Sequence, residues 1–220
     1  MNQPSKSLSF CCVAKEYHLF ERLIFRNVLE KARFAWINSI KSANNILLLG
    51  EGDGRFMEQI IIKNRSSRIT VLDSSPRMLS EAKSRVPKEF QGEIDFFEGD
   101  VREVSYRKNS FDAIVTHFFL DCFAKNCLSL LIPRLSMALS PGGKWLLSDF
   151  VEPSYYRTAK QFRHFWCLRA LYLFFGLVCG VEARKVISPL ALLRLSDLRE
   201  LSRTTYLNGL IVSSAFVKST

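Results

Sequence analysis

The sequence contains no apolar run long enough to cross a membrane. The longest, residues 170–181, has twelve residues, whereas a helix that spans hydrocarbon needs about 20. The amino terminus has only a short apolar stretch at residues 10–14 before charged residues resume, which is well below the apolar region of a secretory signal. These absences favour a chain that works in the cytoplasm.

Motifs for metals and disulfide exchange are missing as well. The six cysteines form no Cys-x-x-Cys pair and have no histidine cluster beside them, which excludes the common zinc and redox patterns. We therefore expect reduced, buried thiols in a reducing compartment, and no metal site.

Acidic residues are scarce relative to basic ones. The chain has 31 Lys and Arg against 21 Asp and Glu, a formal net charge of +10, and ten Lys and Arg stand against four Asp and Glu after residue 150. Charged residues still make up an ordinary 24%, and 18 phenylalanines contribute to a hydrophobic share of 48%, which excludes a disordered chain. The length of 220 residues fits one compact domain.

Short apolar runs alternate with amphipathic segments from residue 46 onward. Continuous apolar runs that end in glycine or aspartate are typical of strands buried on both faces of a parallel sheet. Alternating strands and helices form right-handed βαβ units. The sequence thus predicts an α/β fold, a Rossmann-like doubly wound and mostly parallel sheet with helices on both faces. The expected strands cover residues 46–50, 68–73, 94–100, 111–121 and 144–150, with helices around 56–62, after Ser75 and over 127–139.

We expect one domain made of four parts. The first carries apolar residues at three- and four-residue intervals, from Tyr17 to Ala32, which is typical of an amphipathic helix. The third is expected to form a lid through helices over 156–181 and 189–202. The parts are an N-terminal helical region (1–45), a cofactor-binding core (46–150), a helical lid (151–205) and an antiparallel C-terminal strand (206–220).

Three glycines, Gly50, Gly52 and Gly54, follow the first predicted strand. Glycine at this position lets a cofactor approach the backbone closely and permits positive φ. A dinucleotide site of the G-x-G-x-x-G type would have its third glycine where Arg55 stands. The spacing therefore argues against NAD and favours a nucleoside without a diphosphate.

Acidic residues end the next two predicted strands. Asp73 ends the second, where a carboxylate can accept both ribose hydroxyls of a nucleoside. Asp100, followed by Val101, ends the third, where a carboxylate can accept from an exocyclic adenine amine. A helix cap for Asp73 and a simple turn for Asp100 are the alternative interpretations. Because these strand ends share one sheet edge, the sequence outlines an adenosine site.

The segments GEGDGRF, VLDSSPRML, FFEGDV, FDAIVTHFFLD and LSPGGKWLLSDF, in that order and spacing, resemble the successive motifs of class I S-adenosylmethionine-dependent methyltransferases. The tail YLNGLIVSSAFVK is similar to the ubiquinone/menaquinone C-methyltransferase branch. The resemblance implies S-adenosylmethionine as cofactor. By the family pattern its methionine part would lie at Gly50, Gly52 and Gly54, its ribose at Asp73, with Ser74 and Met78 nearby, and its adenine at Asp100 and Val101.

One position departs from the family pattern, because Leu48 stands where an acid is often found two residues before the first glycine. Glu51, inside the loop, is expected to supply the carboxylate that faces the amino group of the cofactor. Tyr17 stands where relatives often place an aromatic side chain over the cofactor, with core packing as an equally good explanation.

The acceptor side of the expected site centres on His117, after the fourth strand. A near-neutral pKa would suit this imidazole to act as general base toward the methyl acceptor. A polar residue hydrogen-bonded beneath the lid is the alternative, and Asp121 and Asp149 near the same edge allow the same two interpretations.

Residues 155–175 hold eight aromatic side chains, which indicates an apolar pocket or simple packing of the lid. Our first hypothesis is therefore a methyltransferase for a small apolar, aromatic or quinone-like acceptor. A catalytically weak binding or scaffold protein and an RNA-modifying enzyme are the alternatives. Nucleic acid is disfavoured, because neither an Asn-Pro-Pro-Tyr-like motif nor a Pro-Cys pair is present. The basic helix face with Arg157, Lys160 and His164 fits a solvated surface or peripheral contact with anionic membrane.

Overall fold

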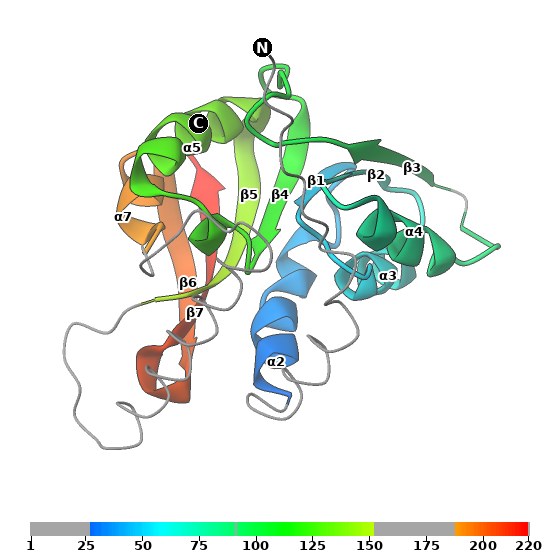
Figure 1. The fold of residues 1–220 in the computed structure, drawn as a ribbon, viewed down its shortest axis with the longest axis horizontal. Coiled ribbons are helices and arrows are strands. Elements are labelled where there is room, and N and C mark those ends of the chain that lie inside the picture. The colour runs from blue at the N-terminus through cyan, green and yellow to red at the C-terminus, as the bar shows by residue number, and fades with distance from the viewer. Residues whose placement is uncertain (1–26, 91, 152–187, 220) are drawn as a thin grey trace, which may run out of the picture.

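The computed structural model describes residues 27–90, 92–151 and 188–219, which form a sheet covered by helices on both faces (Figure 1). The sheet has seven strands in the order β3-β2-β1-β4-β5-β7-β6. The first five pair in parallel, whereas β7 is antiparallel to both β5 and β6. The strands are β1 (Asn45–Leu49), β2 (Arg68–Asp73), β3 (Glu93–Glu98), β4 (Phe111–His117), β5 (Leu139–Phe150), β6 (Leu198–Tyr206) and β7 (Ile211–Lys218).

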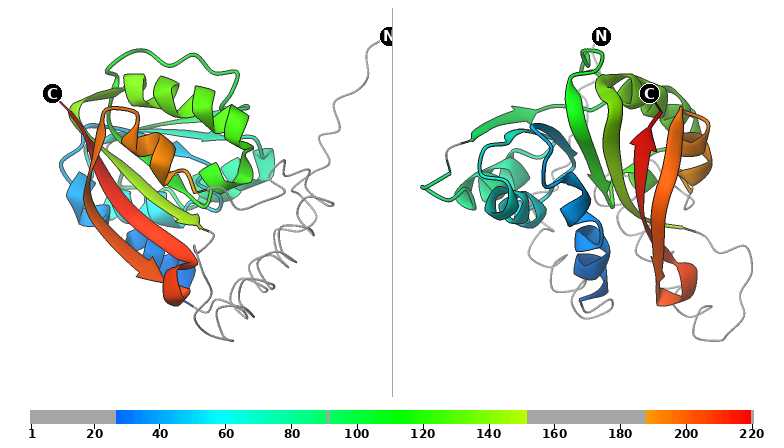
Figure 2. Two further views of the ribbon diagram at one scale, coloured as in Figure 1. Left: turned by 90° about the vertical axis from the view of Figure 1, so that its left-hand side faces the viewer. Right: turned by 180° about the vertical axis from the view of Figure 1, so that it is seen from behind.

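Helices lie on the two faces of this sheet (Figure 2). The longest, α5, packs with α7 on one face, and α3 and α4 pack on the other. The α-helices are α2 (Val28–Phe34), α3 (Arg55–Lys63), α4 (Pro76–Ser84), α5 (Lys125–Ala138) and α7 (Leu190–Arg194), and the 3-10 helices are η2 (Ile37–Ile40), η3 (Leu120–Cys122) and η4 (Leu207–Gly209). The Rossmann-like doubly wound fold predicted from the sequence is confirmed.

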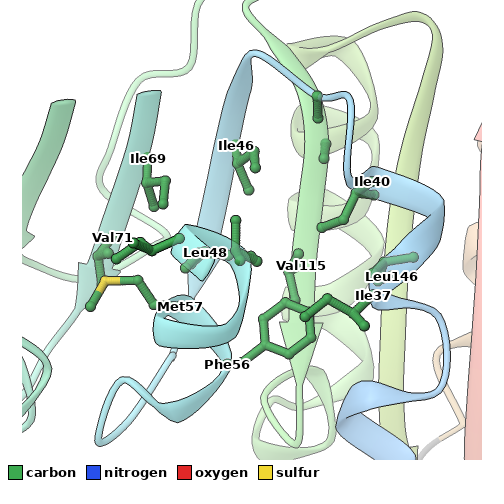
Figure 3. Packing of buried hydrophobic residues seen from close by; sticks show 14 of the residues in the cluster. Ile37, Ile40, Ile46, Leu48, Phe56, Met57, Ile69, Val71, Val115 and Leu146 are labelled. Carbon is green, nitrogen blue, oxygen red and sulfur yellow. The ribbon is translucent and has the colours of Figure 1, made fainter. Parts of the chain in front are cut away.

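Side chains of β1 alternate between two hydrophobic cores. Ile46 and Leu48 point to the α3 side, where they meet Phe56 and Met57 (Figure 3), and Leu47 and Leu49 point to the α5 side. All of β1 from Ile46 onward is buried, as expected for a central parallel strand with helices on both faces. The core therefore fixes the carboxyl end of β1, where the glycine loop begins.

Local signals fixed several helix boundaries as predicted. Ser75 is the N-cap of α4, its hydroxyl accepts from the backbone N–H of Met78 at 3.4 Å, and Pro76 occupies the first helical position. The expected helix around 56–62 is α3, and the one over 127–139 is α5.

The helix predicted over 189–202 is wrong beyond Arg194. Residues 198–206 form β6 instead, which pairs with β7, so the C-terminal β region begins earlier than the expected boundary at 206. Leucines at three-residue intervals, including Leu195, Leu198 and Leu201, imitate a helical stripe. In the structure Leu195, at the end of α7, is 83% exposed and Leu201, in β6, is 42% exposed. The pairing of β6 with β7, which the short-range pattern does not encode, overrides the helical spacing.

Two further boundaries also differ from expectation. The third strand ends at Glu98 and the fourth at His117, so Asp100 lies in the loop after β3 and Asp121 lies in η3. Tyr17, the lid helix over 156–181 and its aromatic and basic residues lie outside the described residues. Within the described part of the chain, no helix has the length and apolarity needed to span a bilayer.

Candidate functional site

The glycine loop runs from the carboxyl end of β1 into α3. Gly50, Gly52 and Gly54 have φ angles of 62°, 71° and 84°, a left-handed conformation that favours glycine. A side chain at Gly54 would meet the Cα of Ala82 in α4 at 2.7 Å, whereas one at Gly52 would meet nothing within 4 Å. Gly54 is therefore needed for helix packing, and Gly52 leaves its backbone open to a ligand.

Asp73 ties the end of β2 to this loop. Its Oδ1 accepts from the N–H of Ser75 at 2.9 Å, and its Oδ2 lies 3.4 Å from the N–H of Gly52. Burial raises the pKa of this carboxyl, against backbone hydrogen bonds that lower it. Ser74 beside it is exposed and Met78 is buried in the first turn of α4. The structure thus brings Asp73 and the glycine loop together as the sequence predicts.

Asp100 lies two residues beyond β3 and is paired with its neighbour. Its Oδ1 accepts from both the N–H and the Nε of Arg102, at 2.8 and 2.9 Å, and this guanidinium lowers the pKa of the carboxyl. Val101 is buried, and its carbonyl accepts from the Tyr106 hydroxyl at 3.2 Å. An adenine amine would therefore have to share Asp100 with Arg102, a partner that the sequence reasoning did not anticipate.

Glu51 caps the helix that follows it. Its Oε1 accepts from the N–H groups of Phe56 and Met57 at 3.0 and 2.9 Å, which are among the unpaired donors at the start of α3. Burial raises the pKa of Glu51 from 4.5 to about 7, although these hydrogen bonds and the charge of Arg33 oppose the shift. The predicted contact with the amino group of a cofactor stays a prediction, and the capping role is additional to it.

Arg33 is a site residue that the sequence reasoning missed. It lies in the last turn of α2, with its guanidinium carbon 5.2 Å from the centre of the Phe118 ring. Its charge acts on Glu51 and on His117, and it lowers the pKa of both. The only signal in the sequence is a cation near a helix end, which does not reveal what the helix faces.

His117 ends β4 and is buried against Phe56, with the two ring centres 4.5 Å apart and the rings nearly perpendicular. Burial, followed by the charge of Arg33, lowers the pKa of His117 to about 3. The expectation of a near-neutral pKa is therefore wrong, and the imidazole is neutral at pH 7. Its Nδ1 is buried and has no hydrogen-bond partner among the described residues. A role as general base stays a prediction, now for a weakly basic group.

The loop after β4 sends two phenylalanines to opposite faces of the sheet. Phe118 has a φ of 53° and packs near Phe150, with ring centres 5.2 Å apart. Phe119 lies over the glycine loop, since a side chain at Gly50 would overlap its ring. It also contacts Phe123, with ring centres 5.1 Å apart. Phe119 and Phe123 therefore form an aromatic wall beside the glycine loop, on the α5 side of the sheet.

Asp149, at the carboxyl end of β5, holds this wall in place. Its Oδ1 accepts from the N–H of Phe119 at 3.0 Å, and the carboxyl is fully buried. Burial, and then the negative charge of the buried Asp121, raise the pKa of Asp149 well above its usual range. Of the two interpretations for this residue, the structure supports a hydrogen-bonded role.

The strand ends thus gather a polar cluster and an aromatic wall at one edge of the sheet. The parallel register of β1 with β2 and β4 brings Glu51, Asp73 and His117 to this edge, where Arg33 joins them from α2. Such an edge, outside the carboxyl ends of parallel strands, is where ligands bind in open α/β sheets.

Comparison with known sequences identifies relatives. A family model described as a methyltransferase domain matches residues 46–143. The ubiquinone/menaquinone biosynthesis C-methyltransferase UbiE of Brucella suis biovar 1 is 28% identical over 153 residues, which is 64% of this chain and 54% of that protein. UbiE of Sinorhizobium fredii is 27% identical over 194 residues, 82% of this chain and 71% of that protein. The chain therefore spans about half the length of the Brucella relative.

Solved structures share the fold. The N-methyltransferase NodS from Bradyrhizobium japonicum superposes with a TM-score of 0.59 at 20% identity, covering 88% of this chain and 98% of that one. Human N-acetylserotonin methyltransferase, in complex with S-adenosylmethionine, gives a TM-score of 0.65 at 20% identity, covering 99% of this chain and 61% of that one. The resemblance drawn from the sequence motifs is confirmed. Residues 46–143 match a methyltransferase domain, and the chain is similar to class I S-adenosylmethionine-dependent methyltransferases, whose cofactor is S-adenosylmethionine.

Proposed function

We propose that this chain transfers the methyl group of S-adenosylmethionine to a small apolar, aromatic or quinone-like acceptor. The observation that carries the proposal is the open backbone at Gly52 beside the Asp73 carboxylate, within a set of acidic and basic groups at one sheet edge. An adenosine with a zwitterionic amino-acid tail matches that set in shape and in charge.

The residues present fit this cofactor. Asp73 keeps a carboxylate at the end of β2, in reach of ribose hydroxyls, while its hydrogen bonds to Gly52 and Ser75 hold it in place. Glu51 accepts the N–H groups of α3 through Oε1, so its Oε2 can face an ammonium group. Bound S-adenosylmethionine supplies a methyl group on a sulfonium, which is already a good leaving group.

The protein then has mainly to align the acceptor and exclude water, because positioning carries most of the rate in such a displacement. The aromatic wall of Phe119 and Phe123 suits an apolar ring. Neutral His117 has a buried Nδ1 without a hydrogen-bond partner among the described residues, and this nitrogen can bond a hydroxyl or carbonyl of an acceptor that reaches it. The relatives named for ubiquinone and menaquinone synthesis support an acceptor of this kind.

An RNA-modifying role is the weaker candidate. Among the described residues, several arginines pair with carboxylates: Arg68 with Asp95, Arg77 with Glu81, Arg85 with Asp53, Arg102 with Asp100, and both Arg194 and Arg203 with Glu200. These pairs reduce the positive charge available to phosphates. Binding of RNA would fall steeply as salt rises, whereas binding of an apolar acceptor would not.

The test is the formation of S-adenosylhomocysteine from S-adenosylmethionine with a panel of quinones, phenols and amines. We expect turnover with at least one quinone or phenol, lost when Asp73 is replaced by Ala and kept when the exposed Glu93 is replaced instead. Cofactor binding without turnover of any acceptor would favour the binding or scaffold alternative. Wild-type affinity in the Asp73→Ala variant would contradict the placement of the ribose.

A further inference from the structure

The C-terminal turn of α2 is fixed to the sheet by a pair of buried hydroxyl groups. Ser148 of β5 and Ser213 of β7 stand opposite each other in the antiparallel register. Both hydroxyls bond the same acceptor, the backbone carbonyl of Ala32, at 2.9 and 2.8 Å, and their oxygens lie 3.0 Å apart. All three residues are almost completely buried.

These two hydrogen bonds satisfy a backbone carbonyl in the last turn of α2. The last four carbonyls of a helix have no partner within it, and a buried carbonyl without a partner costs about 1–3 kcal/mol. The Ala32 carbonyl has both of its lone pairs occupied, and the preceding carbonyl, of Lys31, accepts from the Tyr206 hydroxyl at 3.3 Å. Side chains of the antiparallel strands thus fix two consecutive backbone positions of α2, which lies beside the ends of β5 and β7 (Figure 2).

The next residue along the helix is Arg33. Because the peptide that precedes it is anchored, its Cα has little freedom. The side chain reaches the Phe118 ring, and its charge acts on Glu51 and on His117. Arg33 is therefore the cation of α2 that lies at the carboxyl ends of β1 and β4, next to the glycine loop.

The amino-acid tail of S-adenosylmethionine carries one ammonium and one carboxylate. Glu51 is suited to the first of these groups, and a guanidinium is suited to the second, since its planar donors match a carboxylate. We propose that Arg33 binds the carboxylate of the cofactor, and that the hydroxyls of Ser148 and Ser213 are positioning groups that hold α2 so that Arg33 can reach it. This inference rests on the proposed binding of the cofactor at the glycine loop.

Two nucleosides separate this role from a merely structural one. S-adenosylhomocysteine contains the carboxylate, whereas 5′-methylthioadenosine has the same adenosine and sulfur without the amino-acid tail. We expect the Arg33→Met substitution to lower the affinity for S-adenosylhomocysteine about 10- to 100-fold, which is the effect of losing a charged hydrogen bond. The affinity for methylthioadenosine should not change. Both affinities are measured by titration calorimetry at pH 8. Lys31→Met removes the same charge from an exposed position of the same helix and should change neither affinity.

The serine pair is tested in the same way. The double variant Ser148→Ala with Ser213→Ala should lower the affinity for S-adenosylhomocysteine about three- to tenfold, because a misplaced Arg33 guanidinium loses part of its interaction with the carboxylate. The affinity for methylthioadenosine should not change. In the Arg33→Met background the serine changes should have no further effect on affinity, while they lower the melting temperature equally in both backgrounds. If the double variant does not fold, Tyr206→Phe removes the neighbouring anchor at the surface and should show the same selectivity.

The outcomes distinguish this proposal from the one on which it rests. Equal losses for both nucleosides, or an unchanged affinity of Arg33→Met for S-adenosylhomocysteine, would overturn the role of Arg33. Additive effects of the serine and arginine changes would overturn the positioning role. A wild-type chain that binds neither nucleoside would overturn the cofactor assignment and this inference with it.

Discussion

Glu51 couples the helix cap to the expected cofactor site, and its ionisation can be measured. The Glu51→Gln substitution keeps an oxygen that can accept from the N–H groups of Phe56 and Met57, but it removes the titration. Comparing this variant with the wild type at several pH values therefore isolates the effect of one carboxyl.

The sign and the size follow from the raised pKa. Burial raises the pKa of Glu51 from 4.5 to about 7, so the folded state binds its proton more tightly than the unfolded state does. The stability from this group is complete below pH 4.5 and is lost as the pH rises through 7. At 1.36 kcal/mol for each unit of pKa, the loss approaches about 3 kcal/mol. His117 has the opposite sign, since its lowered pKa adds stability as the pH rises through the range up to 6.5.

Urea denaturation at pH 5 and pH 8 measures this difference. We expect the free energy of unfolding of Glu51→Gln, relative to wild type, to rise by up to about 3 kcal/mol between the two pH values, while the contribution of His117 cancels. Cofactor binding should show the same linkage, because a cationic tail favours the ionised carboxylate. The affinity of the wild type for S-adenosylhomocysteine should then rise from pH 5 to pH 7 and that of the variant should not. Parallel pH profiles for the two proteins would refute the reasoning.

Three further predictions concern the loop and the strand ends. Asp73→Asn should lower the affinity for S-adenosylhomocysteine, measured by calorimetry, at least about tenfold, whereas Asp95→Asn on β3 should not change it. Equal affinities of Asp73→Asn and the wild type would rule out the ribose contact. Gly54→Ala should lower the free energy of unfolding by more than about 2 kcal/mol, because its side chain would clash with α4. Gly52→Ala should lower the free energy of unfolding by about 1 kcal/mol and mainly reduce the affinity for the cofactor. A larger loss of stability in Gly52→Ala than in Gly54→Ala would contradict the packing of Gly54 against α4. Because the pKa of His117 is about 3, the titration of this residue should not appear in the pH profile of the turnover rate near pH 6.5. An inflection near pH 6.5 that is present in the wild type and absent in His117→Gln would show that the pKa of His117 is near neutral.

Much of the fold could be predicted from local patterns. The apolar run of β1, the glycines after it and the Ser75-Pro76 start of α4 each act over a few residues, so the sequence reveals them directly. The β6 strand could not be recognised in this way. Its leucine spacing is helical, and only pairing with β7, a contact between distant segments, makes it a strand.

In the candidate site too, features that depend on neighbouring residues could be predicted from the sequence, whereas contacts between distant segments could not. Asp73 and the glycine loop could be predicted because they follow consecutive strands, whose ends meet in any parallel sheet. The contact of Phe119 with Gly50 and the approach of Arg33 to Phe118 join residues far apart in the chain. The pKa of His117 depends on its burial and on that same arginine, so no sequence pattern could supply it.

The left-handed backbone at Phe118 fixes the length of the turn between β4 and η3. Phe118 packs with the residues of α2, Phe150 and Ile211, and Phe119 packs with those of α5. Inserting or deleting one residue here would exchange the two rings between the faces. Homologous chains that keep both aromatic contacts should therefore tolerate changes of ring type at these positions far better than any change in the number of residues.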